Sequence, residues 1–250
     1  MSKQKTEEFF KDIVYVNYDE YIINQVARNL TPEEIADKKI LDYGCGSGCV
    51  SYYLLKYHPW QVTGIDVGER NIEYANDRIK KYGYQNIKFI CADLEHYSFG
   101  AETYDVIWSD TVIEVINIPL EALIKSFYDL LNPHGILYVS FTKKNIKNKI
   151  IFTVTSILSK IVPRCCRILF SYLLLPTYYA ANIFSRKANV NTEQFKNKAA
   201  YLFIPYLRLI STDEIVTIMK NANFSVCYVR DRIKSDVNSP DHIEIKAIKQ

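Results

Sequence analysis

The stretch KILDYGCGSGCV, from Lys39 to Val50, decides the fold of this chain. It begins with a short apolar run that is typical of a buried β-strand. Glycines then stand at every second position, Gly44, Gly46 and Gly48, and a helix-like apolar spacing begins at Val50. Glycine lacks the Cβ that would hold a ligand away, and free backbone amides collect where a helix begins. The stretch therefore predicts a strand, a ligand-binding turn and a helix.

Three interpretations of this turn compete. The dinucleotide fingerprint Gly-x-Gly-x-x-Gly requires a third glycine where this chain has Cys49, so a pyrophosphate site fits poorly. The pattern that runs from Asp42 to Gly48, acidic-x-Gly-x-Gly-x-Gly, resembles the first motif of the class I S-adenosylmethionine-dependent methyltransferases. The third interpretation is a tight turn that binds no ligand.

Further motifs of the same family follow in order along the chain. The strand expected at 61–66 ends at Asp66, where a carboxylate can accept from both hydroxyls of a ribose. The strand expected at 87–91 runs into Asp93 and Leu94, which resemble the family's adenine-recognition motif. The strand expected at 104–109 matches the family's Tyr/Phe-Asp-x-Val/Ile pattern. The resemblance rests on the set of motifs and their order.

The resemblance covers about residues 39–141 and 206–250 and implies the fold. We expect an α/β domain with a doubly wound, seven-stranded, mostly parallel sheet and an antiparallel edge hairpin. His134 and Asn223 stand where the family tends to have glycine. Residues 1–38 are expected to form a helical segment over the cofactor cleft, with a helix at 6–30 and a capping box that begins at Thr31.

The resemblance also implies a set of residues that bind S-adenosylmethionine. It places Asp42 near the methionine amino group, Asp66 on the ribose, and Ser109 close to the sulfonium. Asp93 and Leu94 would surround the adenine. The complete expected cofactor set is Asp42, Gly44, Cys45, Gly46, Gly48, Asp66, Val67, Asp93, Leu94 and Ser109.

The region after the fourth strand is where the resemblance places catalytic groups. Related small-molecule O-methyltransferases often show a pattern like Glu-x-x-Glu-His there, and this chain retains Glu114 but has Val115 in place of the histidine. This departure argues against a histidine base and leaves Asp110 and Glu114 as the candidate catalytic residues. The stretch 109–112 does not match the Pro-Pro motif of the DNA amino-methylating enzymes, which argues against nucleobase methylation.

Residues 142–205 do not fit the sheet and predict a helical insertion after the fifth strand. No Asp or Glu occurs from Leu130 to Thr192, while Lys and Arg recur among apolar turns. Because ligands bind at the carboxyl ends of strands in such sheets, this insertion can form a lid over the substrate. Other roles stay open: a membrane-surface element, a transmembrane span, or a surface for an acidic protein or nucleic acid. Pro176 interrupts the longest uncharged run and disfavours a span.

Composition excludes several classes of function. The chain has 250 residues and is 48% hydrophobic, which is enough for a large hydrophobic core. Its net charge is only +3, so the overall charge gives no indication of nucleic-acid binding. Six cysteines form no Cys-x-x-Cys pair and four histidines are scattered, which predicts reduced thiols and no metal site. The polar N-terminal stretch does not resemble a signal peptide, so a cytoplasmic protein is expected.

These features together predict S-adenosylmethionine-dependent methyl transfer to a small, hydrophobic or aromatic acceptor, most readily at oxygen. The chain resembles the ubiquinone and menaquinone biosynthesis methyltransferases. The apolar insertion favours a lipid-like substrate, and peripheral membrane contact through 142–205 is an option. The alternative is a non-catalytic cofactor-binding scaffold that docks on a membrane or partner through the same insertion. The sequence does not indicate the oligomeric state.

Overall fold

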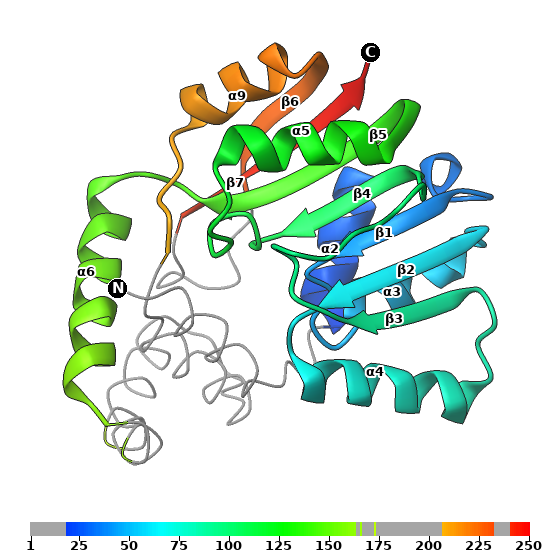
Figure 1. The fold of residues 1–250 in the computed structure, drawn as a ribbon, viewed down its shortest axis with the longest axis horizontal. Coiled ribbons are helices and arrows are strands. Elements are labelled where there is room, and N and C mark those ends of the chain that lie inside the picture. The colour runs from blue at the N-terminus through cyan, green and yellow to red at the C-terminus, as the bar shows by residue number, and fades with distance from the viewer. Residues whose placement is uncertain (1–18, 164–165, 167–172, 174–206, 233–240) are drawn as a thin grey trace.

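The computed structural model describes residues 19–163, 166, 173, 207–232 and 241–250 (Figure 1). The strands are β1 (Lys39–Tyr43), β2 (Gln61–Asp66), β3 (Ile87–Cys91), β4 (Tyr104–Asp110), β5 (Leu131–Thr142), β6 (Phe224–Asp231) and β7 (His242–Lys249). The helices are α2 (Asp19–Asn29), α3 (Cys49–Leu54), α4 (Glu69–Tyr82), α5 (Leu120–Leu130), α6 (Ile146–Ile161) and α9 (Thr212–Asn221), with 3₁₀ turns η1 (Pro32–Glu34) and η2 (Leu55–Tyr57).

The seven strands form one sheet in the order β3-β2-β1-β4-β5-β7-β6. All pairs from β3 to β5 are parallel, while β7 runs antiparallel to both β5 and β6. This arrangement confirms the predicted fold class. The antiparallel strand, β7, lies second from the edge, and β6 forms the edge itself. The strand order reverses at β1, between β2 and β4, which is where such sheets bind their ligands.

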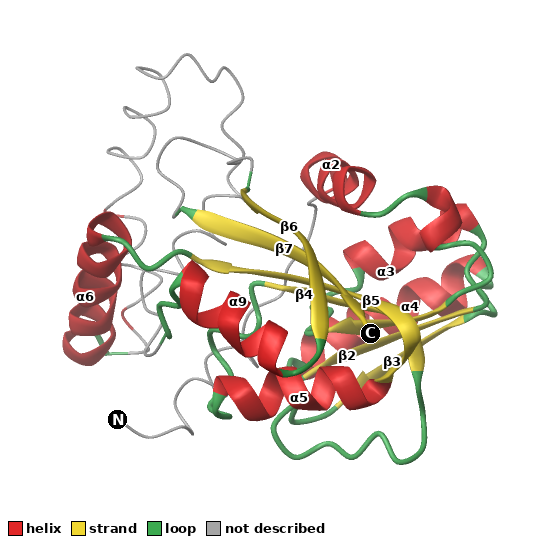
Figure 2. Cartoon of the chain, turned by 90° about the horizontal axis from the view of Figure 1, so that it is seen from above, coloured by secondary structure: helices red, strands yellow, loops and turns green. Residues whose placement is uncertain are grey.

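Helices cover both faces of the sheet (Figure 2). Side chains alternate along each strand, so Ile40 of β1 packs toward α2 and α3 while its neighbour Leu41 packs toward α5 and α9. The same alternation separates Trp108 from Ile107 on β4. Apolar burial on both faces is the pattern expected of a parallel sheet, and it holds the carboxyl ends of β1, β2 and β4 along one edge.

Two residues adopt the left-handed conformation where the family tends to have glycine. His134 has φ 62° and lies between Leu131 and Ile136, where the pairing of β5 with β4 shifts register. Residues 132–135 therefore form a bulge inside β5, which begins at Leu131. Asn223 has φ 68° and connects α9 to β6, and asparagine tolerates this conformation better than most residues.

The N-terminal segment and the insertion are described in part. The capping box at Thr31 is confirmed, because Thr31 N donates to Glu34 Oε2 at 2.9 Å and Thr31 Oγ1 accepts from Glu34 N. Helix α2 is the second half of the helix expected at 6–30, whose first half lies outside the described residues. Helix α6 opens the 142–205 insertion, most of which also lies outside them. No helix of the described part is long and apolar enough to cross a membrane.

Candidate active site

The glycine turn between β1 and α3 is built from left-handed backbone. Gly44, Gly46 and Gly48 have φ angles of 80°, 52° and 78°, a region that side chains other than glycine adopt only with strain. The amides of Gly44 and Cys45 donate to the carbonyl oxygen of Ile65 on β2, at 2.8 and 3.0 Å. These bonds hold the turn against the carboxyl end of the neighbouring strand.

Two of these glycines are also required by space. A Cβ on Gly44 would lie 2.3 Å from Cγ2 of Val112, and a Cβ on Gly48 would lie 2.4 Å from Cζ of Phe89. Val112 follows β4 and Phe89 belongs to β3. The turn is therefore packed between the side chain of Val112 and that of Phe89, and the sequence signal for glycine has a steric cause.

Asp66 ends β2 and fastens the glycine turn to the next connection. Its Oδ2 accepts from Gly46 N at 2.9 Å, and its Oδ1 accepts from Gly68 N at 2.7 Å. Burial raises the pKa of Asp66, although these amides counteract the shift. Each carboxylate oxygen keeps a further lone pair. The turn, Asp66 and the adjoining Val67 thus form one rigid edge, with Asp66 placed to accept further hydrogen bonds.

Asp42 is a buried acid at the centre of the same edge. Its Oδ2 accepts from Ser51 Oγ of α3 at 2.6 Å. Burial is the main cause that raises its pKa to about 7; the nearby carboxyl groups of Asp110 and Asp66 add to this shift, and the hydrogen bond from Ser51 opposes it. Among the described residues no basic side chain forms an ion pair with Asp42. Such a site favours a positively charged group from a ligand.

The loop after β3 is tied to β1. Asp93 Oδ1 accepts from Glu95 N at 2.9 Å, and its other oxygen contacts the exposed ring of His96. The carbonyl oxygen of Leu94 accepts from Tyr43 Oη at 3.0 Å. The structure therefore brings Asp93 and Leu94 to the same end of the sheet as the glycine turn, and it places His96 at the surface.

The end of β4 contains an unsatisfied hydroxyl and a strained residue. Ser109 is fully buried, and its Oγ has no hydrogen-bond partner in the part of the chain that is described. Thr111 has φ 58°, which is unfavourable for a β-branched residue. Backbone strain of this kind often gathers at functional sites, where the surrounding structure holds it in place.

Asp110, predicted as a catalytic residue, is held in a bidentate ion pair with Arg232. Both guanidinium nitrogens donate to its carboxylate, Nη2 to Oδ2 at 2.9 Å. Ser140 of β5 donates to the same carboxylate and accepts from Arg232 Nη1 at 3.0 Å. Arg232 follows β6 and is 93% buried, since its exposed fraction is 7%. The contacts make Asp110 a tie between the ends of three strands.

Glu114, the other predicted catalytic residue, lies buried beside β5. Its carboxylate accepts from Thr142 N at 2.9 Å and from Thr142 Oγ1 at 2.8 Å. Burial raises its pKa to about 7, and the bonds from Thr142 oppose that shift. The carbonyl oxygen of Glu114 accepts from Arg208 N at 2.8 Å. Glu114 thus holds the loop between β4 and α5 against the end of β5.

Replacing Glu114 with glutamine is expected to weaken the pH dependence of stability. The folded-state pKa of about 7 exceeds the unfolded value of about 4.3. Between these values the folded state keeps a proton that the unfolded state has lost, so stability falls as pH rises through this window and levels off above it. Between about pH 5 and pH 8, the free energy of unfolding measured in urea should fall by roughly 2–3 kcal/mol less in the variant than in the wild type.

The control for this variant is Glu121→Gln on the exposed side of α5, which should leave the profile unchanged. Asp42 titrates in the same window, so the Glu114 variant should keep part of the slope. An unchanged profile in Glu114→Gln would contradict the assigned burial effect.

Sequence reasoning missed Ser51 and Arg232. Ser51 carries no motif signal, since serine is common in the first turns of helices. Arg232 had a signal: Arg230 and Arg232 alternate across the end of β6, and Glu244 and Lys246 alternate along β7. Charges at every second position of a strand indicate a polar face turned toward other protein groups.

The comparisons with known proteins agree with this geometry. Residues 40–135 match the model of a methyltransferase domain family. The ubiquinone biosynthesis O-methyltransferase of Coxiella burnetii is 32% identical over 129 residues, 51% of this chain and 54% of that protein. The malonyl-[acyl-carrier protein] O-methyltransferase of Priestia megaterium is 34% identical over 137 residues, 54% of this chain and 47% of that protein. The chain spans about half the length of the curated relatives it matches.

Solved structures share the fold over nearly the whole chain. Magnesium protoporphyrin IX methyltransferase from Synechocystis PCC 6803, with S-adenosylhomocysteine bound, has a TM-score of 0.62 at 15% identity and covers 99% of each chain. An N-methyltransferase from Bradyrhizobium japonicum WM9 has a TM-score of 0.57 at 15% identity, covering 100% of this chain and 99% of its own. The matched segment holds the glycine turn, Asp66, Asp93 and β4, so residues 40–135 are similar to a methyltransferase domain and the chain has the fold of the class I S-adenosylmethionine-dependent methyltransferases.

Proposed function

We propose that this protein transfers a methyl group from S-adenosylmethionine to a small, hydrophobic or aromatic acceptor, most readily at oxygen. The observation that carries the proposal is the left-handed glycine turn fastened to the Asp66 carboxylate, beside the buried acid Asp42. The choice of oxygen is supported by the two similar proteins from Coxiella and Priestia, which are both O-methyltransferases by name.

The residues present fit this cofactor. Asp42, buried and without a basic partner in the described chain, suits the ammonium of the methionine moiety. Asp66 suits the ribose diol, because its oxygens retain lone pairs. The unpartnered hydroxyl of Ser109 lies on the strand that ends at the same edge. Asp93 and Leu94 complete the proposed set at the adenine.

The chain's contribution to the chemistry is alignment. S-adenosylmethionine, when bound, supplies a methyl group on a sulfonium that is a good leaving group. Thr111 and the glycine turn both lie at the carboxyl edge of the sheet, and their constrained backbone makes this edge rigid. An acceptor bound there would lie in line with that methyl group. A rigid edge of this kind reduces the entropy lost in bringing the two reactants together.

Asp110 and Glu114 are our proposed carboxylates for deprotonating an acceptor hydroxyl. Each is engaged, Asp110 by Arg232 and Glu114 by Thr142, so a proton transfer would require one of these contacts to open. An acidic hydroxyl such as a phenol needs little help from a base. We therefore propose that both residues act first by fixing the loop after β4, and that the acceptor hydroxyl is acidic.

Asp66→Ala is expected to weaken S-adenosylmethionine binding at least about tenfold, because the ribose loses a charged acceptor and the turn loses two amide contacts. Isothermal titration calorimetry measures this change. Asp77→Ala removes the same charge from an exposed site on α4 and should bind like the wild type. Near-wild-type affinity in the Asp66 variant would contradict the ribose assignment.

The function itself is tested by titrating the protein with S-adenosylmethionine, S-adenosylhomocysteine and NAD. Micromolar binding of both adenosyl compounds, with no NAD binding, is expected. An acceptor screen that follows S-adenosylhomocysteine formation from phenolic and lipid-like compounds then finds the substrate. NAD binding alone would overturn the proposal. Cofactor binding without turnover of any acceptor would favour the non-catalytic scaffold.

A further inference from the structure

Helix α6 carries an exposed apolar stripe. Its members are Ile146, Ile150, Val154, Ile157 and Ile161, with exposed fractions of 80%, 59%, 49%, 48% and 70%. Steps of three and four residues place all five on one side of the helix. Such a continuous apolar surface is unusual on a helix face that is exposed to solvent, and it indicates a binding face.

The opposite side of α6 fixes how this stripe is presented. Asn148 is fully buried and its amide donates to the carbonyl oxygens of Lys143, at 2.7 Å, and Asp241, at 2.9 Å. The Asn145 side chain caps the helix by accepting from Asn148 N at 2.8 Å, and it donates to Asp241 Oδ2 at 2.8 Å. Thr155 is buried on the same side, two turns further. The apolar stripe is therefore held outward.

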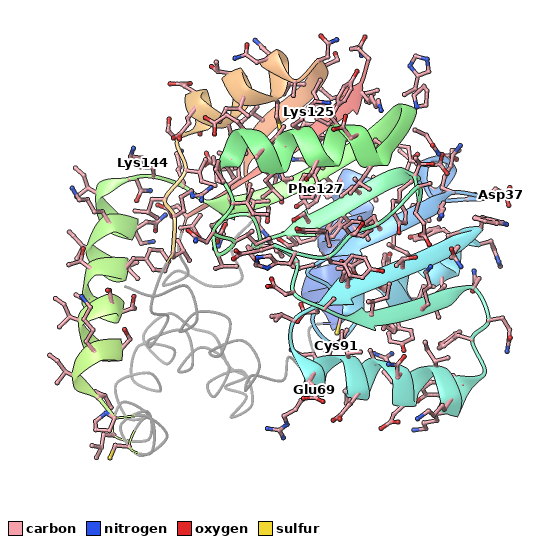
Figure 3. All side chains as sticks on the ribbon, viewed as in Figure 1. Asp37, Glu69, Cys91, Lys125, Phe127 and Lys144 are labelled. Atoms are coloured by element: carbon pink, nitrogen blue, oxygen red, sulfur yellow. The ribbon has the colours of Figure 1, made fainter. Side chains whose placement is uncertain are left out.

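The figures show where this helix stands. In Figure 1, α6 lies at the end of the molecule toward which β2 and β4 point. In Figure 3, side chains along its outer side extend away from the protein, and Lys144 lies just before the helix begins. The stripe thus lies at the same end of the molecule as the carboxyl edge that bears the candidate site.

Lysines border the stripe on both sides. At 100° per residue, Lys147 lies on one flank, and Lys149 and Lys160 lie on the other. Lys147 also reaches Asp241 at 3.4 Å, whereas no described acidic side chain pairs with the other two. No acidic residue occurs anywhere from Leu130 to Thr192. The face is therefore apolar at its centre and positively charged at its margins.

We propose that the outer face of α6 docks on an anionic lipid surface, with the helix in the plane of the membrane. The 16 residues of α6 extend about 24 Å. An apolar stripe bordered by lysines matches the boundary between acyl chains and anionic headgroups. A second copy of the chain fits less well, since a two-fold contact would bring the two lysine borders together. Nucleic acid offers no partner for the apolar centre.

Vesicle co-sedimentation of the full chain tests this proposal. The probes are vesicles of phosphatidylcholine alone and of phosphatidylcholine with phosphatidylglycerol. We expect binding to the anionic vesicles, weakened by high salt, and little binding to the neutral ones. Ile150→Glu and Ile157→Glu should each weaken binding about tenfold or more, because burial of an isoleucine contributes a factor of that order.

The control is Trp60→Glu, which places the same charge on an exposed apolar residue outside α6 and should bind like the wild type. Circular dichroism confirms that each variant is folded. The proposal would be overturned if the Ile150 and Ile157 variants bound the anionic vesicles as well as the wild type does, or if the wild type bound neither kind of vesicle. It would also be overturned if the wild type formed a dimer in analytical ultracentrifugation that Ile150→Glu dissociated, because a second copy would then cover the face. None of these outcomes depends on methyl transfer.

Discussion

Replacing Gly44 with alanine is expected to lower the free energy of unfolding by roughly 2–5 kcal/mol, the sum of left-handed strain and overpacking against Val112. The residue has φ 80°, and the added Cβ would lie 2.3 Å from a γ-carbon of a buried β-branched side chain. Val112 has few rotamers to move into. Relief must come from backbone movement, which would displace the glycine turn. We therefore expect S-adenosylmethionine binding to be lost in calorimetry.

Gly83→Ala separates the two causes of this effect. Gly83 has φ 70°, close to that of Gly44, but an added Cβ would meet nothing within 4 Å. This variant should lose only the strain, about 1 kcal/mol, and keep full cofactor affinity. Thermal unfolding should separate the two variants, since about 1 kcal/mol shifts the melting temperature by some 2–4 °C in a chain of this size. Equal losses in both variants would show that Val112 does not restrict the turn.

The local elements were predictable because each has a local cause. The strands expected at 61–66 and 87–91 coincide with β2 and β3. Their apolar runs end at an acid or a turn, and the glycine turn needs glycine for conformation and for space. The chemistry of the site was less accessible. The sequence favoured Asp66 as a ribose ligand, but it did not indicate that the same carboxylate would accept from Gly46 and Gly68.

Contacts between distant strands could not be predicted from the motifs. Asp110 and Arg232 are 122 residues apart and meet only because β6 runs parallel to β4 in the same sheet, so that both strands end at the same edge. The motifs therefore indicated Asp110 as a catalytic candidate, but they did not indicate the ion pair with Arg232 that it forms at the end of β4. The orientation of α6 was also hidden, since its apolar residues could equally have faced the core until Asn148 was found buried on the other side.

The ion pair of Asp110 with Arg232 is part of a longer buried network. With the Gln25 amide oriented to suit both neighbours, its oxygen accepts from Arg232 Nε at 3.2 Å and its nitrogen donates to Glu244 at 2.5 Å. Glu244 is fully buried and accepts from Arg230 Nε at 3.0 Å. The network joins α2 to the ends of β4, β6 and β7. The charges balance only while every member is present.

Arg232→Met is expected to destabilise the protein by about 2–4 kcal/mol, because it leaves the partly buried carboxylate of Asp110 without its positive partner. Lys125→Met is the matched control: its pair with Asp129 on α5 is exposed and should contribute less than about 1 kcal/mol. Urea unfolding measures both losses. The end of β4 should also loosen, so Arg232→Met should bind S-adenosylmethionine more weakly than Lys125→Met does.

A double-mutant cycle separates the ion pair from simple loss of packing. Asp110→Asn removes the charge that Arg232 neutralises, so the double variant Asp110→Asn/Arg232→Met should be less destabilised than the sum of the single variants by about 1–3 kcal/mol. Additive losses would mean that the two groups do not stabilise one another. Weak cofactor binding that persists in the double variant, after stability has partly recovered, would show that Arg232 positions the end of β4 for the ligand as well as supporting the fold.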